Sequence, residues 1–323
     1  MASHARAQSG AAAKASIIRS LAESGLSLGI AAWTEPSLVE SGELYPPDVV
    51  TAEQRLRYYA ECYPLTEVDS TFYHPLAQRT AALWAARTPP GFVFDVKAFR
   101  LLTHHPTPPS TLWRDLREAL PPEQAGKPRV YARDLPRELV AQALRRFAAS
   151  VEPLRTGGHL GIVLFQLPRY VYPSRASYGY LEWVSEQLPD VQVGVEFRQS
   201  RWMDDDHCQG TLDFLTRHGL TYVCVDEPQG FPSSVPPVAA ATSDVAVVRF
   251  HGRNTERWEA RGVRPVQRHT YEYRPEELAE WVPRIRALHE HGRPVHLIFT
   301  NVHRGYAAHS ARILARLLSD RDG

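Results

Sequence analysis

Eight short β-rich runs alternate with helix-patterned segments along this chain, and this alternation constrains the fold more than any other feature. Strands separated by helix-length segments form right-handed βαβ units with a parallel sheet. Eight such units predict closure into an α/β (β/α)8 TIM barrel. A doubly wound open sheet is the alternative, but no glycine-rich phosphate turn follows the first run. The predicted strands are Leu28–Trp33, Leu65–Ser70, Phe92–Ala98, Leu160–Leu167, Gln192–Arg198, Thr221–Asp226, Val245–Gly252 and Val295–Asn301. The predicted helices are Ala52–Tyr63, Gln78–Arg87, Glu138–Val151, Tyr178–Gln187, Gln209–Arg217, Pro275–His291 and Ala307–Leu318.

The expected domain organisation is a single TIM-barrel domain over 26–323, preceded by a flexible N-terminal tail over 1–25. The tail lacks the apolar core of a secretion signal, and a short helix is expected over Ile17–Glu23. Two proline-rich connections, Thr103–Pro136 and Pro228–Ser243, make the barrel irregular after its third and sixth strands. Long loops at strand carboxyl ends serve as lids or substrate walls, or they are surface insertions.

Composition argues against several classes of protein. The net charge of +1 gives no global field that attracts nucleic acid or a membrane surface. The three cysteines, Cys62, Cys208 and Cys224, show no CxxC spacing, which argues against a disulfide framework or a zinc site. No apolar run has the length of a membrane helix. We therefore expect a cytoplasmic protein with no membrane partner.

Charged residues recur on one face of most predicted strands, always late in the strand. Because side chains alternate along a strand, apolar positions should meet the helices and the charged positions should point into the barrel. In the third strand this places Asp95 and Lys97 inside. The other expected inner residues are Trp33, Glu67, Asp69, Gln166, Glu196, Arg198, Asp226, Arg249, His251 and Asn301. His296 is expected on the outer face of the last strand.

Two interpretations of these inner charges are open. Buried charge is costly unless it is paired or used. The charges therefore either form an internal ion-pair network, for example Glu196 with Arg249, or they build a functional site. We favour the site, because barrel enzymes carry their active sites at this end.

A series of short motifs runs in a fixed order from about Leu28 to the end of the chain. They are Gly29–Trp33, Glu67–Tyr73, Phe92–Ala98 with Thr103-His104, Leu164–Pro168, Val195–Arg198 with Trp202, Arg249–Gly252 and Phe299–Asn301. This order resembles the YecE-like family of uncharacterised proteins, domain of unknown function 72. The resemblance implies a TIM barrel similar in shape to endonuclease IV-type barrels, and it implies no established reaction. Thr300 stands where the family pattern has the first of two asparagines.

The inner residues predict a polar, partly cationic pocket at the strand carboxyl ends. Glu67 or Glu196 is the expected base and His251 the acid, with Lys97 as the fourth catalytic candidate. Arginine offers bidentate donors to an anion and lysine a point charge. The expected substrate-binding residues are Trp33, Asp69, Phe72, Tyr73, His104, Gln166, Arg198, Asp226, Arg249 and Asn301.

These residues predict an enzyme, a hydrolase or a lyase, that acts on an anionic or polyhydroxylated small substrate such as a phosphoester. One alternative is a nucleic-acid-binding or processing protein, by likeness of barrel shape alone, and another is a non-catalytic ligand-binding protein. No cofactor is expected. A divalent metal is disfavoured, because the inner-face histidines are few and the lysine and arginines would repel the ion.

Overall fold

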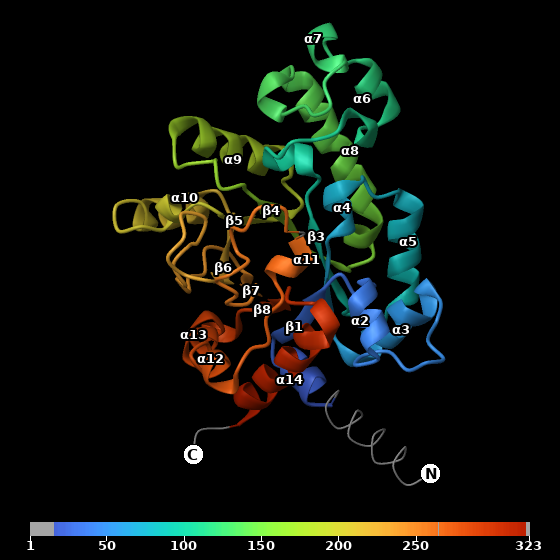
Figure 1. Cartoon of the computed structure of the whole chain (residues 1–323), viewed down its shortest axis with the longest axis vertical. Coiled ribbons are helices and arrows are strands. Elements are labelled where there is room, and N and C mark those ends of the chain that lie inside the picture. The colour runs from blue at the N-terminus through green and yellow to red at the C-terminus, as the bar shows by residue number, and fades with distance from the viewer. Residues whose placement is uncertain (1–15, 264, 321–323) are drawn as a thin grey trace.

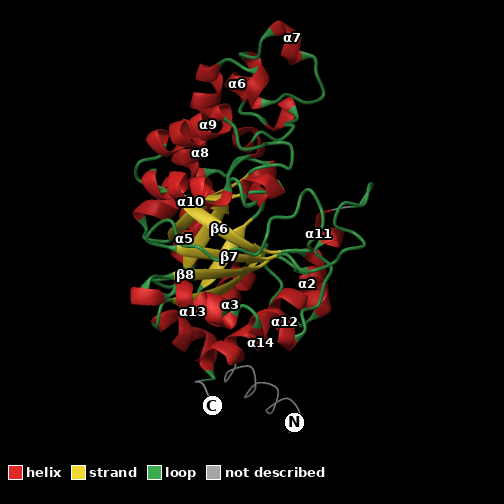
Figure 2. Ribbon diagram, turned by 90° about the vertical axis from the view of Figure 1, so that its left-hand side faces the viewer, coloured by secondary structure: helices red, strands yellow, loops and turns green. Residues whose placement is uncertain are grey.

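The computed structural model describes residues 16–263 and 265–320. Its eight strands are parallel and close into one barrel, with β8 hydrogen-bonded to β1. The strands are β1 (Leu26–Ala31), β2 (Leu65–Val68), β3 (Val93–Lys97), β4 (Leu160–Gln166), β5 (Gln192–Glu196), β6 (Thr221–Asp226), β7 (Ala246–Phe250) and β8 (Val295–Phe299). Figure 2 shows them at the centre of the molecule, surrounded by helices. The predicted (β/α)8 barrel is confirmed.

The longer helices alternate with the strands along the chain, as predicted, and the last of them follows β8. They are α3 (Ala52–Cys62), α5 (Gln78–Arg87), α8 (Arg137–Thr156), α9 (Arg175–Gln187), α10 (Cys208–Arg217) and α14 (Tyr306–Ser319). The short α-helices are α2 (Pro36–Ser41), α4 (Ser70–Tyr73), α6 (Arg114–Glu118), α7 (Pro122–Ala125), α11 (Pro265–Arg268), α12 (Pro275–Ala279) and α13 (Val282–Leu288). The single helix expected over Pro275–His291 is thus two helices. Pro283 explains the break, because it has no amide hydrogen to donate to the Ala279 carbonyl.

The start of the described chain packs against the barrel. Residues 16–23 are helical, as expected for Ile17–Glu23, and Ile18 and Leu21 belong to the main apolar core. The predicted flexible tail over 1–25 is therefore wrong for 16–25. Its first fifteen residues lie outside the described part of the chain.

The two irregular connections are present where the sequence predicts them. The segment after β3 holds α6, α7 and the 3₁₀ turns η1 (Arg100–Thr103), η2 (Pro109–Thr111) and η3 (Ala132–Asp134). It projects beyond the end of the barrel near α8, at the top of Figure 1. The segment 228–243 after β6 contains no helix.

Two separate apolar clusters divide the core. The main cluster lies between strands and helices, whereas Ile162, Leu164, Val223 and Val247 form a small cluster of their own. Their chain neighbours on the same strands belong to the main cluster, so the small cluster fills the inside of the barrel.

A contact between a histidine and a carboxylate inside the barrel corrects one prediction. The Nδ1 atom of His296 lies 3.0 Å from Asp95 Oδ2, and Asp95 Oδ1 accepts a hydrogen bond from the Ile162 amide at 2.9 Å. The inward direction predicted for Asp95 is confirmed. His296 faces inward as well, and the prediction of an outer position is wrong because Leu297 and Phe299 occupy the helix-facing positions of β8.

The close approach of β1 and β2 can be tested at Gly29. A Cβ atom there would lie 2.2 Å from the Leu65 carbonyl oxygen. Gly29→Ala should therefore lower the free energy of unfolding by about 1–3 kcal/mol, measured by urea denaturation. In the control, Gly210→Ala on exposed α10 meets no atom within 4 Å and should raise stability by up to about 1 kcal/mol. Equal stability of Gly29→Ala and the wild type would contradict this packing.

Candidate functional site

A pocket of about 570 Å³ opens at the carboxyl ends of the barrel strands. We call it the barrel-mouth pocket. Predicted site residues from β3, β4 and β7 and from the segments after β2 and β5 line it together. They are Asp69, Phe72, Tyr73, Lys97, Gln166, Arg198, Arg249 and His251.

A continuous chain of ion pairs forms the floor of this pocket. Arg249 donates through Nε and Nη2 to both oxygens of Glu67, at 2.8 and 2.6 Å, and through Nη1 to Glu196. Arg198 Nε forms an ion pair with Glu196 Oε1 at 2.7 Å, and Arg198 Nη1 donates to Glu227 at 2.7 Å. The ion-pair chain therefore runs Glu67–Arg249–Glu196–Arg198–Glu227. The three carboxylates are at most 1% exposed, so the ion-pair interpretation of the inner charges holds for these residues.

Glu196 is the most heavily bonded carboxylate of the floor. Besides the two arginines it accepts from Gln166 Nε2 at 2.5 Å, and its Oε1 lies 3.2 Å from His251 Nε2. Burial alone would raise the pKa of Glu196, but Arg249 and Arg198 hold it well below the usual value. A carboxylate with this many donors is a poor proton acceptor, which argues against Glu196 as the general base.

His251 is held neutral at the edge of the floor. Burial, reinforced by Arg198, lowers the pKa of His251 well below its usual value. Its Nδ1 atom lies 2.8 Å from Thr300 Oγ1. The Thr300 hydroxyl donates to the Phe250 carbonyl at 3.1 Å, so both ring nitrogens of His251 face oxygen atoms, one of Thr300 and one of Glu196. Thr300 thus takes part in the floor although it departs from the family pattern.

The two ends of the ion-pair chain differ electrostatically from its centre. Burial raises the pKa of Glu67 to about 7 and that of Glu227 to about 8, although an arginine lies against each. These carboxyl groups therefore change protonation state near neutral pH. Both oxygens of Glu67 accept from Arg249, however, so the predicted base roles of Glu67 and Glu196 find no support in the geometry of the floor.

Two predicted residues on β6 and β8 point away from the pocket. Asp226 accepts from Trp281 Nε1 at 2.7 Å on the helix side of the barrel, and Asn301 donates to the Tyr271 carbonyl. Their inner-face predictions are wrong by one residue, because the residues that face inward are Glu227 and Thr300. Because both faces of these strands carry apolar residues, the sequence does not reveal which alternate positions face into the barrel.

Trp33 and His104 were predicted to bind substrate, but neither lines the barrel-mouth pocket. The Trp33 ring packs against Trp84 and Phe94, with centroids 5.3 and 6.2 Å away, because β1 ends at Ala31 and the chain turns. His104 adopts a left-handed conformation with φ 62° and lines a different cavity. His105 lines the barrel mouth in its place.

Two of the predicted site residues, Lys97 and Asp69, form an ion pair near the opening of the pocket. Their Nζ and Oδ1 atoms lie 3.4 Å apart, and the Lys97 ammonium lies 4.9 Å from the Phe72 ring centroid. Asp69 Oδ1 is buried and makes no hydrogen bond. Although burial would raise the pKa of Asp69, Lys97 and Arg249 lower it, so Asp69 is ionised with an acceptor oxygen to offer.

The segment after β7 supplies wall residues that the sequence prediction missed. Trp258 is 5% exposed, lies 4.9 Å from the Arg198 guanidinium, and leaves its Nε1 donor without a partner. Arg268 Nε is likewise buried without a partner, and His269 Nδ1 lies 3.0 Å from the His251 carbonyl. No periodic pattern marks this irregular segment, so only the folded chain reveals these residues.

Within residues 16–263 and 265–320, no group of three or more histidine, cysteine, aspartate and glutamate side chains is arranged to hold a metal ion. No helix in that part of the chain is long and apolar enough to cross a bilayer.

The fold and the pocket together define a parallel (β/α)8 barrel protein with a charged site at the strand carboxyl ends. A family model described as a protein of unknown function, DUF72, matches residues 27–323. The chain belongs to this family, and the resemblance noted from its motifs is confirmed.

Named relatives agree with this membership. The UPF0759 protein YunF of Bacillus subtilis (strain 168) is 28% identical over 296 residues, which cover 90% of this chain and 94% of the relative. A DUF72 protein of Thermotoga maritima MSB8, TM1631, has a TM-score of 0.70 and 28% identity, with 91% of this chain and 99% of that chain covered. EF0366 of Enterococcus faecalis V583 has a TM-score of 0.73 and 23% identity, with coverage of 92% and 97%.

Removal of Arg249 tests the ion-pair chain. Arg249→Met leaves Glu67 and Glu196 facing each other without their shared cation, so we expect a loss of about 3–5 kcal/mol in urea denaturation. Restoring neutrality with Glu67→Gln and Glu196→Gln in the same chain should recover part of this loss. The control is Arg57→Met, which breaks an exposed pair with Glu53 and should cost at most about 1 kcal/mol. An Arg249→Met effect as small as the control would contradict the network.

The pH dependence of stability tests the neutral histidines. Burial, with Arg198 adding to it, lowers the pKa of His269 to about 3. An unfolded histidine titrates near pH 6.5, so the stability due to neutral His269 is lost as the pH falls from about 6.5 towards 3. Between pH 7.5 and 5, His269→Gln should lose about 2 kcal/mol less than the wild type, measured by urea denaturation at both values. Exposed His309→Gln serves as the control, and an unchanged pH dependence in His269→Gln would refute the assignment.

Proposed function

We propose that the barrel-mouth pocket binds a small polyhydroxylated molecule and is the active site of an enzyme of the hydrolase or lyase class. The observation that carries this proposal is a group of buried polar atoms in its lining residues that make no hydrogen bond within the described residues, although one of them, Asp69 Oδ1, lies 3.4 Å from Lys97 Nζ. They are the acceptor Asp69 Oδ1 and the donors Trp258 Nε1 and Arg268 Nε. Buried polar groups are nearly always hydrogen-bonded, so atoms of this kind around a cavity favour a polar ligand there.

The charge distribution favours hydroxyl groups over a phosphoester. Arg249 and Arg198 are occupied by the carboxylates of the ion-pair chain, so they have little charge left to neutralise an anion. Lys97 and Asp69 offer one donor and one acceptor side by side. A hydroxyl group donates to such a carboxylate and accepts from such an ammonium at the same time. Tyr73, which is 44% exposed, adds apolar surface for a ring beside the buried Phe72.

The geometry also supports a division of roles in the reaction. Asp69 is ionised and open to the pocket, which suits a group that accepts a proton from a substrate hydroxyl or a water molecule. Lys97 beside it suits stabilisation of the negative charge that then develops on oxygen. Gln166 and His251 are positioned by their contacts with Glu196. In this proposal Glu196 and Arg249 are positioning residues that never touch the substrate.

Ligand retention tests the binding part of the proposal. Native mass spectrometry of the purified protein should detect a bound hydroxyl-rich molecule. Lys97→Met and Asp69→Asn should each lower its occupancy at least tenfold, because each removes one of the paired contacts. The matched control is Lys127→Met, since Lys127 is an exposed lysine far along the chain from the pocket residues. Full retention by both pocket variants would refute the site.

Turnover tests the enzymatic part. The identified molecule should be converted by the wild type, followed by NMR spectroscopy, while Asp69→Asn should be slower by at least a hundredfold. Quantitative recovery of unchanged ligand from the wild type would instead support the alternative of a non-catalytic binding protein.

A further inference from the structure

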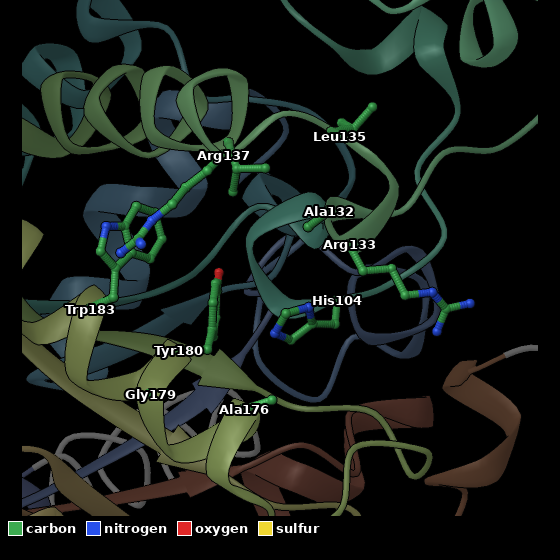
Figure 3. Close-up of a pocket in the computed structure, with 10 residues that line it drawn as sticks. His104, Ala132, Arg133, Leu135, Arg137, Ala176, Gly179, Tyr180 and Trp183 are labelled. Carbon is green, nitrogen blue, oxygen red and sulfur yellow. The ribbon is translucent and has the colours of Figure 1, made fainter.

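A second hollow lies outside the barrel mouth, between α8, α9 and the segment that follows β3. Two cavities of about 370 and 320 Å³ adjoin there, since His104, Arg133 and Ala176 line both. We call them together the aromatic groove. Figure 3 shows the larger cavity, with His104 and Tyr180 near its centre.

The charge of the aromatic groove is entirely positive. Arg133 and Arg137 line it, and none of its lining residues is an aspartate or a glutamate. Within the described chain, Arg137 forms no ion pair, and the carboxylate paired with Arg133 is its own neighbour Asp134, at 3.8 Å. These guanidinium groups therefore keep donors for an anion, in contrast to the neutralised arginines of the barrel mouth.

Aromatic side chains supply most of the groove's remaining surface. Tyr170 and Tyr172 are 42% and 48% exposed, an unusual state for large apolar rings. The Arg137 guanidinium lies 5.5 Å from the Trp183 ring centroid. In Figure 3, Arg137 and Trp183 lie on one side of His104 and Tyr180, and Arg133 lies on the other. Arginines therefore flank the rings at both ends of the larger cavity.

The groove and the barrel-mouth pocket share a wall. The Tyr170 hydroxyl donates to the His104 carbonyl at 2.7 Å, and this bond joins the loop after β4 to the segment after β3. The next residues along the chain, Arg169 and His105, line the barrel-mouth pocket. The aromatic groove and the barrel-mouth pocket thus lie on opposite sides of a wall that this hydrogen bond holds together.

We propose that the aromatic groove binds a nucleoside phosphate, with the base against the exposed tyrosines and the phosphate on Arg133, the arginine that lines both cavities. Exposed aromatic faces stack planar bases, and an arginine binds phosphate through its forked donors. A carboxylate-free lining leaves this anionic group unopposed. The proposal concerns a site distinct from the barrel mouth and does not depend on the function proposed for it.

Titration of the full chain with adenosine monophosphate tests the ligand class. Isothermal calorimetry should show one saturable site. Adenosine, which has no phosphate, and ribose 5-phosphate, which has no base, should each bind at least tenfold more weakly. Absence of binding at millimolar adenosine monophosphate, or equal binding of ribose 5-phosphate, would overturn the proposal.

Variants locate the site. Arg133→Ala should weaken adenosine monophosphate binding at least tenfold, whereas Arg137→Ala, at the other end of the larger cavity, should weaken it less. The matched control is Arg145→Ala, which removes an exposed arginine on the same helix α8 and should leave the affinity unchanged. Lys97→Met should leave it unchanged too, whereas a loss in that variant would place the nucleotide in the barrel mouth and overturn the proposal. Circular dichroism of each variant checks that it is folded.

A titration with an oligonucleotide distinguishes a free nucleotide from a nucleic-acid strand as the ligand. A twelve-residue single-stranded oligoadenylate should bind no more tightly per molecule than adenosine monophosphate if the free nucleotide is the ligand. Binding of the oligomer alone, with a steep salt dependence, would overturn the free-nucleotide proposal in favour of a strand.

Discussion

The pairing of Arg249 with Glu67 and Glu196 is the interaction on which the rest of the barrel mouth depends. A guanidinium inside a barrel is tolerated only when carboxylates neutralise it and use its donors. Glu67 and Glu196 come from β2 and β5, so the charge on β7 draws together strands that are not neighbours in the sheet. The need to neutralise Arg249 therefore determines the floor of the pocket. Through Glu196 it also positions Gln166 and His251.

Charged side chains in this protein fall into two groups: those whose hydrogen-bonding atoms are all engaged by other protein groups, and those that keep atoms available for a ligand. In the floor each arginine bridges two carboxylates, and Glu196 is ionised but fully engaged. At the opening, Asp69 keeps an oxygen without a hydrogen bond and Lys97 has a single ion-pair partner. In the aromatic groove Arg137 has no carboxylate partner at all within the described residues. The same residue types therefore serve different purposes, and the number of protein contacts that each one makes distinguishes them.

The sequence predicted the inner face well where one face of a strand is clearly apolar. In β3, β5 and β7 the large side chains occupy alternate positions, and the residues between them face the barrel interior. In β6 and β8 both faces are apolar, and the predictions for Asp226 and Asn301 miss the true inner residues by one position. Register is fixed by the hydrogen-bonded partners of a strand, which a single strand's composition does not contain.

The sequence by itself determined the eight-stranded barrel, its two irregular connections, its family and the gathering of charges at the strand carboxyl ends. These features follow from local periodicity, which is written along the chain. Only the tertiary structure decided which charges neutralise one another, which polar atoms remain without partners, and that Trp258 and Arg133 lie beside cavities. Those outcomes depend on distances between segments far apart in the chain, and burial sets their energies, so no local pattern can specify them.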